Sequence, residues 1–150
     1  TPARLFDALD LNKGDAFFDL GSGRGQVVIA AAMYANAPRT ATGIEFVPAR
    51  HEAAARVLKR CHGLSWTNKV SFECSDALVC DLQQATKAFV CNAAFEADLD
   101  RRFAAALAKW RAPKLIKVAT VKPLDATSLA EADLQLTEVT AIAGSWEPKG

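Results

Sequence analysis

The sequence lacks any apolar run long enough to cross a membrane, because charge or glycine interrupts every run well short of about 20 residues. It does not open on the basic and then apolar segment of a secretory signal. Only four cysteines occur, Cys61, Cys74, Cys80 and Cys91, and none belongs to a CxxC pair. Cys61 precedes His62, but no second ligand pair follows at a spacing typical of zinc sites. We therefore expect an intracellular protein with reduced thiols, no membrane span and no bound metal.

An excess of charge of either sign is missing as well. The chain carries 18 Lys and Arg against 17 Asp and Glu, a net charge of +1 at pH 7. So small a charge gives no broad attraction for nucleic acid, acidic segments or membrane surfaces. We expect no strong nucleic-acid patch in this core. The 150 residues, 51% of them hydrophobic, predict a single domain over residues 1–150.

What the sequence does have is an alternation of short apolar runs with longer amphipathic ones. The apolar runs predict strands at residues 16–20, 41–46, 69–74, 88–91, 115–121 and 134–142. Helices are expected at 25–35, 49–61, 78–84 and 97–110, with a loop at 123–131 that has room for one helical turn. This alternation predicts a three-layer αβα, Rossmann-like fold with a mostly parallel sheet. Ligands of such sheets bind beyond the carboxyl ends of the strands.

The first predicted strand ends in a glycine loop, Gly21-Ser22-Gly23-Arg24-Gly25. Glycines between a strand and a helix let a ligand approach the backbone closely. The next strand ends in Glu45, where a carboxylate can accept hydrogen bonds from both hydroxyls of a ribose. This combination suits nicotinamide and methionine nucleosides equally.

Asp19 discriminates between these two classes of ligand, because it lies directly before the glycines. A carboxylate there would repel the pyrophosphate of a dinucleotide. It would attract the ammonium and sulfonium groups of S-adenosylmethionine. The GxGxG spacing also departs from the dinucleotide GxGxxG pattern. The alternative role for Asp19 is to brace the glycine turn.

Polar residues also follow the third and fourth strands. Asp76, with Ala77 beside it, is placed to bind the exocyclic amine of adenine, or else to cap a helix. Asn92 follows the fourth strand, where its amide can orient an acceptor amine or hold the methionine end of the cofactor, or else form a turn. Phe95 is expected to pack on adenine or on the acceptor channel, or else in the core.

Several segments together resemble the disruptor-of-telomeric-silencing family, the non-SET histone lysine methyltransferases, which are class I S-adenosylmethionine-dependent enzymes. The segment Phe17–Val28, FFDLGSGRGQVV, resembles the family's glycine motif. Residues 43–50 resemble its ribose-binding strand and the helix that follows, and residues 89–95, FVCNAAF, its F-V-N-N-x-A-F motif. Lys122-Pro123 and Ser145-Trp146 match later landmarks. In this chain Cys91 replaces the first Asn of the paired motif, and Ala93 replaces an aromatic residue.

The resemblance assigns roles to individual residues. Asp19, Gly21, Gly23, Gln26, Glu45, Asp76 and Phe95 would line the cofactor pocket, together with Ser22, Gly25 and Ala77 of the same segments. Asn92 would sit beside the transferred methyl. Ala119, Thr120 and Val121, with Trp146, would line the lysine channel. The assignment of Gln26 depends on the resemblance, because by itself it is an ordinary residue of a first helical turn.

The sequence therefore predicts transfer of a methyl group from S-adenosylmethionine to a protein lysine, with a histone or nucleosome as partner. The product would be S-adenosylhomocysteine, and a histone substrate would place the protein in the nucleus rather than the cytoplasm. The alternatives are a methyltransferase acting on RNA or a small molecule, a nicotinamide-dependent oxidoreductase, and a binding module without activity.

Overall fold

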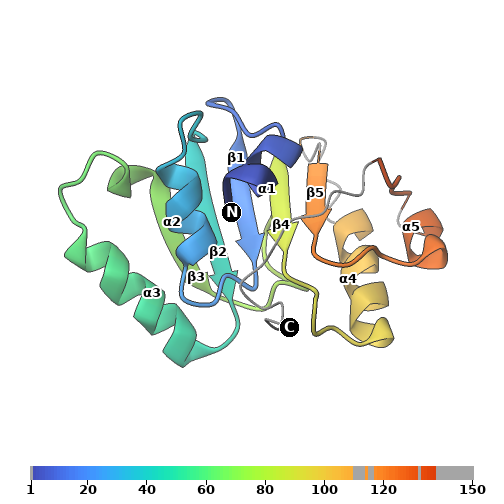
Figure 1. Ribbon diagram of the computed structural model, residues 1–150. Helices are drawn as coiled ribbons and strands as arrows, with labels where there is room; N and C mark the ends of the chain where they lie inside the picture. The colour runs from blue at the N-terminus through green and yellow to red at the C-terminus, as the bar shows by residue number, and fades with distance from the viewer. Residues whose placement is uncertain (1, 110–113, 115–116, 132, 138–150) are drawn as a thin grey trace, which may run out of the picture.

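The computed structural model describes residues 2–109, 114, 117–131 and 133–137. Its strands are β1 (Ala16–Leu20), β2 (Thr40–Glu45), β3 (Val70–Cys74), β4 (Lys87–Val90) and β5 (Lys117–Thr120). They form one sheet in the order β3-β2-β1-β4-β5, and every neighbouring pair is parallel (Figure 1). All carboxyl ends therefore lie along one edge, which is the lower edge in Figure 1.

Helices cover both faces of this sheet. Those of the first face are α1 (Pro2–Ala8), α2 (Gln26–Ala32) and α3 (Pro48–Arg60), while α4 (Ala97–Lys109) covers the second and α5 (Ala126–Glu131) packs on α4. A 3-10 turn, η1 (Thr67–Lys69), precedes β3. The predicted three-layer α/β architecture is confirmed. No described helix is long and apolar enough to span a bilayer.

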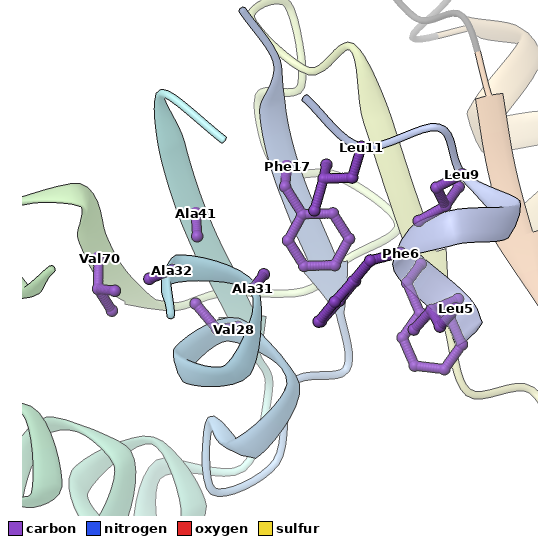
Figure 2. Packing of buried hydrophobic residues seen from close by; sticks show 11 residues of the cluster. Leu5, Phe6, Leu9, Leu11, Phe17, Val28, Ala31, Ala32, Ala41 and Val70 are labelled. Atoms are coloured by element: carbon purple, nitrogen blue, oxygen red, sulfur yellow. The ribbon is translucent and has the colours of Figure 1, made fainter. Parts of the chain in front are cut away.

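The core on the first face is centred on two aromatic rings. Phe6 of α1 meets Phe17 of β1 edge to face, with ring centroids 5.9 Å apart and planes at 82°. Figure 2 shows α1 and α2 side by side over the strands, with Ala31 beside these rings and Val28 on the side of α2 that faces Val70. Edge-to-face packing of this kind stabilises by about 1 kcal/mol beyond the area it buries. It anchors α1 to the central strand.

β1 is buried at all five positions, since helices cover both of its faces. Phe17 belongs to the core under α1 and α2, whereas Phe18 and Leu20 belong to the core under α4. This central strand therefore reads as a continuous apolar run with one exception, Asp19. A buried carboxylate in such a strand requires a reason beyond packing.

Two predictions of secondary structure need correction, and one helix was not predicted. Residues 78–84 form turns instead of a helix, because Val79 and Cys80 both donate to the carbonyl of Asp76 and a second side-chain turn begins at Asp81. Residues 134–137 are not a strand, because Leu134 closes a turn after α5 and packs toward α4. The rest of that expected strand lies outside the described residues. Helix α1 was not predicted.

Candidate ligand site at the carboxyl edge of the sheet

The glycine loop follows β1 and turns the chain into α2. Gly21, Gly23 and Gly25 adopt left-handed backbone angles, with φ of 88°, 56° and 80°. A Cβ at Gly21 or Gly23 would meet nothing within 4 Å, whereas one at Gly25 would lie 2.4 Å from Cζ of Phe72. Gly25 therefore lets the loop pack against β3. Gly21 and Gly23 border open space, as a loop that receives a ligand requires.

Glu45, the last residue of β2, is 5% exposed and is held by two backbone groups. Its Oε2 accepts from the N–H of Gly23 at 2.7 Å, and its Oε1 accepts from the N–H of Val47 at 2.8 Å. An ionised carboxylate offers about four acceptor sites, so each oxygen keeps capacity for a further donor. These two bonds fix the carboxylate beside the glycine loop and leave it able to accept from two neighbouring hydroxyls.

Asp19 lies on β1 next to Glu45 and is only 2% exposed. Among the described residues, no hydrogen bond to its carboxylate is found. Burial, and secondarily the charge of Glu45, raises the pKa of Asp19 to about 7. An unsatisfied buried carboxylate of this kind destabilises a protein unless a cation or a donor meets it. Its role as a brace of the glycine turn finds no support, because it holds no group of that turn.

The Oγ of Ser22 is also buried without a hydrogen-bond partner in the described structure, as is Nδ1 of His51 on α3. The side chain of Ser22 lies over Gly43 of β2, where an added Cβ would be 2.6 Å from the Ser22 Oγ. Gly43 therefore allows the loop to approach the sheet, a role that our sequence analysis missed. The sequence contained a signal for this role, because a glycine inside a predicted strand often marks a close approach of backbone or ligand.

Asp76 follows β3 at the same edge of the sheet. Its Oδ1 accepts from the N–H of Leu78 at 2.8 Å, so it acts as the cap of a turn. No described residue donates to its other oxygen. The two roles considered for this residue are therefore compatible. Ala77 is half-buried and packs against the core under α4.

Asn92 is completely buried just beyond β4, and its amide is fully used. Its Nδ2 donates to Asp100 of α4 and to the carbonyl of Lys122, both at 3.0 Å. Its Oδ1 accepts from the N–H groups of Val121 and Lys122, both at 2.9 Å. This differs from the expectation of an amide that faces the methyl group, because no donor or acceptor capacity is left. The amide ties the ends of β4 and β5 together.

Lys122 completes this cluster, which sequence analysis had noted only as a landmark. Its Nζ lies 2.9 Å from Oδ2 of Asp100 and also donates to the carbonyl of Phe95. Asp100 is buried and thus receives both the amide of Asn92 and the ammonium of Lys122. The loop that follows β4 is held closed at both ends by these contacts.

Phe95 and Gln26, which were predicted to line the cofactor pocket, differ in burial. The half-buried ring of Phe95 packs against Phe103 of α4, with centroids 6.4 Å apart, which matches the core alternative. Gln26 is the exposed first residue of α2, immediately behind the glycine loop. Its contact with a cofactor stays a prediction.

Thr120 is the last residue of β5 and pairs with Val90, which places it at the carboxyl edge beside the Asn92 cluster. It is half-buried, as are Ala119 and Val121. Trp146 lies outside the described residues, so its place in a channel stays a prediction. Among the residues that the structure describes, no group of three or more His, Cys, Asp or Glu is placed to hold a metal.

An acid on β1, a glycine loop and an acid on β2 thus lie at one edge of a parallel sheet. Several proteins of known structure share this fold. They include an RNA methyltransferase from Salinibacter ruber in complex with S-adenosyl-L-homocysteine (24% identity, TM-score 0.59, 73% of this chain and 66% of that chain). Others are the methyltransferase domain of bacterial CtHen1 (16%, 0.62, 74% and 60%) and the [4+2]-cyclase SpnF (23%, 0.60, 73% and 39%).

These similarities establish the fold alone, since one of the three proteins is a cyclase. The chain spans between 39% and 66% of the length of these three proteins. No curated protein sequence matches the chain.

The family comparison is more specific than the structural ones. The model of the histone methylation protein DOT1 matches residues 2–143, nearly the whole chain. The match covers the glycine loop, both strand-end acids and the Asn92 cluster. The chain therefore belongs to the DOT1 histone methylation protein family.

Proposed function

We propose that this domain transfers a methyl group from S-adenosylmethionine to the side-chain nitrogen of a lysine in a histone. The observation that carries the proposal is the buried carboxylate of Asp19, which has no hydrogen-bond donor among the described residues and stands beside Glu45 and the glycine loop. A cationic nucleoside without phosphate satisfies these groups together. The family match supports the histone substrate and, with it, a nuclear location.

The residues present fit this cofactor group by group. Asp19 is suited to the ammonium of the methionine part, because a cation at a buried carboxylate offsets its desolvation. Glu45 keeps one acceptor site on each oxygen for the two ribose hydroxyls. The free oxygen of Asp76 suits the exocyclic amine of adenine. Open space over Gly21 and Gly23 admits the body of the ligand.

The same site disfavours a nicotinamide dinucleotide. A pyrophosphate over the glycine loop would face the carboxylates of Asp19 and Glu45, and two like charges about 4 Å apart repel by several kcal/mol near a protein surface. Arg24 of the loop is exposed and forms no ion pair with either carboxylate among the described residues. The oxidoreductase alternative therefore lacks an observation in its favour.

When bound, S-adenosylmethionine supplies a methyl group activated by its positive sulfur. The neutral lysine nitrogen would take up this methyl group, the sulfur would keep the electron pair of its broken bond to carbon, and the methylated amine would then release one proton to solvent. The protein's task is alignment and exclusion of water, which together contribute most in such displacements. The Asn92 cluster holds the ends of β4 and β5, between which the acceptor would approach.

The acceptor amine must be neutral to react. An apolar surrounding lowers the pKa of a lysine by disfavouring its charged form. Ala119 and Val121 flank Thr120 at the end of β5 and pack in part against the core under α1 and α2, so only the part that stays exposed can supply apolar surface of this kind. With Trp146 they would form the walls of the lysine channel.

Transfer of a radiolabelled methyl group from S-adenosylmethionine to recombinant nucleosomes, free histones and RNA tests the proposal. We expect label in a histone, and its loss in Asp19→Asn and Glu45→Gln. Glu131→Gln, an exposed acid on α5, is the matched control. Label in RNA alone would transfer the assignment to the RNA alternative. Tight binding of S-adenosylhomocysteine with no transfer to any acceptor would contradict an enzymatic role.

A further inference from the structure

A cavity lies at the opposite edge of the sheet, where the strands begin. It has a volume of about 390 Å³, and its lining includes Lys13, Arg39, Lys69, Tyr34 and Trp66. Arg39 directly precedes β2, Lys69 directly precedes β3, and Lys13 lies in the turn before β1. Because β3, β2 and β1 are parallel neighbours, the topology brings these three cations to one edge.

No acidic side chain of the described residues lines this cavity, and the nearest one that a hydrogen bond connects to it is Asp7, behind the hydroxyl of Tyr34. None of the three cations forms an ion pair with a described residue. The carboxyl end of α2, at Ala32, also borders it, but a helix end carries only about half an elementary charge. Gathered cations without counter-charges raise the local concentration of anions. This local excess is invisible in the net charge of +1.

Two aromatic side chains stand beside the cations. Trp66 is half-buried, with one part packed on the core under α2 and the remainder lining the cavity. Tyr34 is held by Asp7 through its hydroxyl and by Phe6 through its ring, at a centroid distance of 5.2 Å. An aromatic surface beside cations is the combination that binds a base together with its phosphate.

We propose that this cavity is a second ligand site, which binds the phosphate of a nucleotide at Lys13, Arg39 and Lys69 and the base against Trp66. The phosphate chemistry is the same for a free nucleotide and for a nucleotide unit within a nucleic-acid strand. The volume is within the range of small-molecule pockets, about 300–1,000 Å³, which fits one nucleotide.

This site is separate from the one at the carboxyl edge. The two share no residue, and they stand at opposite ends of β1, whose five residues span about 16 Å at 3.3 Å per residue. The carboxyl-edge site presents carboxylates, whereas this one presents cations. The inference therefore does not depend on the proposed methyl transfer.

Titration with adenosine monophosphate, adenosine and inorganic phosphate tests the site, in the presence of saturating S-adenosylhomocysteine so that the carboxyl-edge site is filled. We expect adenosine monophosphate to bind more tightly than either fragment. Its affinity should fall at least about tenfold in the double variant Arg39→Glu, Lys69→Glu, which reverses two of the three contacting charges. Trp66→Leu should lower the affinity for adenosine monophosphate and leave the affinity for inorganic phosphate unchanged.

The matched control is the double variant Lys59→Glu, Arg60→Glu. It makes the same change in net charge in the last turn of α3, at exposed residues outside this cavity. Its affinity for adenosine monophosphate should stay within about twofold of the parent chain. If the charge-reversed pocket variant does not fold, as a thermal melt would show, the neutral pair Lys13→Gln, Arg39→Gln replaces it.

A short single-stranded oligodeoxynucleotide distinguishes the two sources of the phosphate. Binding of adenosine monophosphate without binding of the oligonucleotide assigns the site to a free nucleotide. Binding of the oligonucleotide with the same loss in the pocket variants assigns it to a strand. The proposal is overturned if neither probe binds, or if the pocket variants and the α3 control lose equal affinity.

Discussion

Asp19 and Glu45 bring two carboxyl groups to the ends of neighbouring parallel strands, and the charge of Glu45 adds to the effect of burial on Asp19. The result is a pKa of about 7 for Asp19, so this group is partly protonated at neutral pH. Glu45 is held by two backbone N–H groups, while Asp19 has no such support in the described structure.

Affinity for S-adenosylhomocysteine should depend on pH. Its ammonium favours the ionised form of Asp19, so binding below pH 7 must release the proton that Asp19 holds. We expect the affinity to rise with pH up to about 7, by as much as tenfold per unit, and then to level off. Calorimetry between pH 5.5 and 8 measures this. In Asp19→Asn the affinity should be low and nearly independent of pH over this range; an unchanged slope would contradict the assignment.

Stability should fall as pH rises from about 4 to about 7. The folded pKa of Asp19 lies above that of the unfolded chain, so the folded state binds more protons within this window and loses stability as they leave. The loss is a few kcal/mol at most. Asp19→Asn should remove this part of the pH dependence and be more stable than the parent chain at pH 8. Urea unfolding at several pH values checks it, with Glu131→Gln expected to keep the parental slope.

Gly21→Ala and Gly63→Ala form a matched pair. Both glycines have left-handed φ, 88° and 94°, and a Cβ at either would meet nothing within 4 Å. Each replacement should cost about 1–2 kcal/mol of stability through the backbone alone. Only Gly21 borders the proposed ligand. Only Gly21→Ala should therefore lower the affinity for S-adenosylhomocysteine, by about tenfold or more. Equal affinities of the two variants would show that the open space over Gly21 is not the ligand site.

Asn92→Ala should destabilise the domain by about 2–4 kcal/mol, because Oδ1 of Asp100 and three backbone groups at the end of β5 lose their buried partner. Asn68→Ala is the control, since Asn68 is exposed. Thermal unfolding gives the comparison. A variant with parental stability that no longer transfers methyl would instead support the predicted place of Asn92 beside the methyl group.

The architecture and the acids of the site were accessible to sequence analysis for a physical reason. Buried parallel strands read as apolar runs, and the one polar residue in such a run, Asp19, stands out against them. Glu45 stands out in the same way at the end of β2. Residue type and position along the chain carry this information directly.

The remaining features depend on contacts between distant segments. Asn92 has the same residue type whether its amide faces a ligand or bonds to Asp100 and Lys122, and only the fold decides between them. Residues 78–84 have the composition of a helix, but backbone bonds to Asp76 close a turn first. Lys13, Arg39 and Lys69 are far apart in sequence, so their common cavity follows from the strand order alone.

β1 comes before the other described strands along the chain, yet it lies in the middle of the sheet that they form. Residues up to Cys74 can form β1, β2 and β3 with the helices between them while β4 is still within the ribosome. During that interval the edge of β1 that β4 will cover is unpaired, and unpaired strand edges promote aggregation. The time that the segment between β3 and β4 takes to cross the sheet therefore sets how long this edge of β1 stays unpaired.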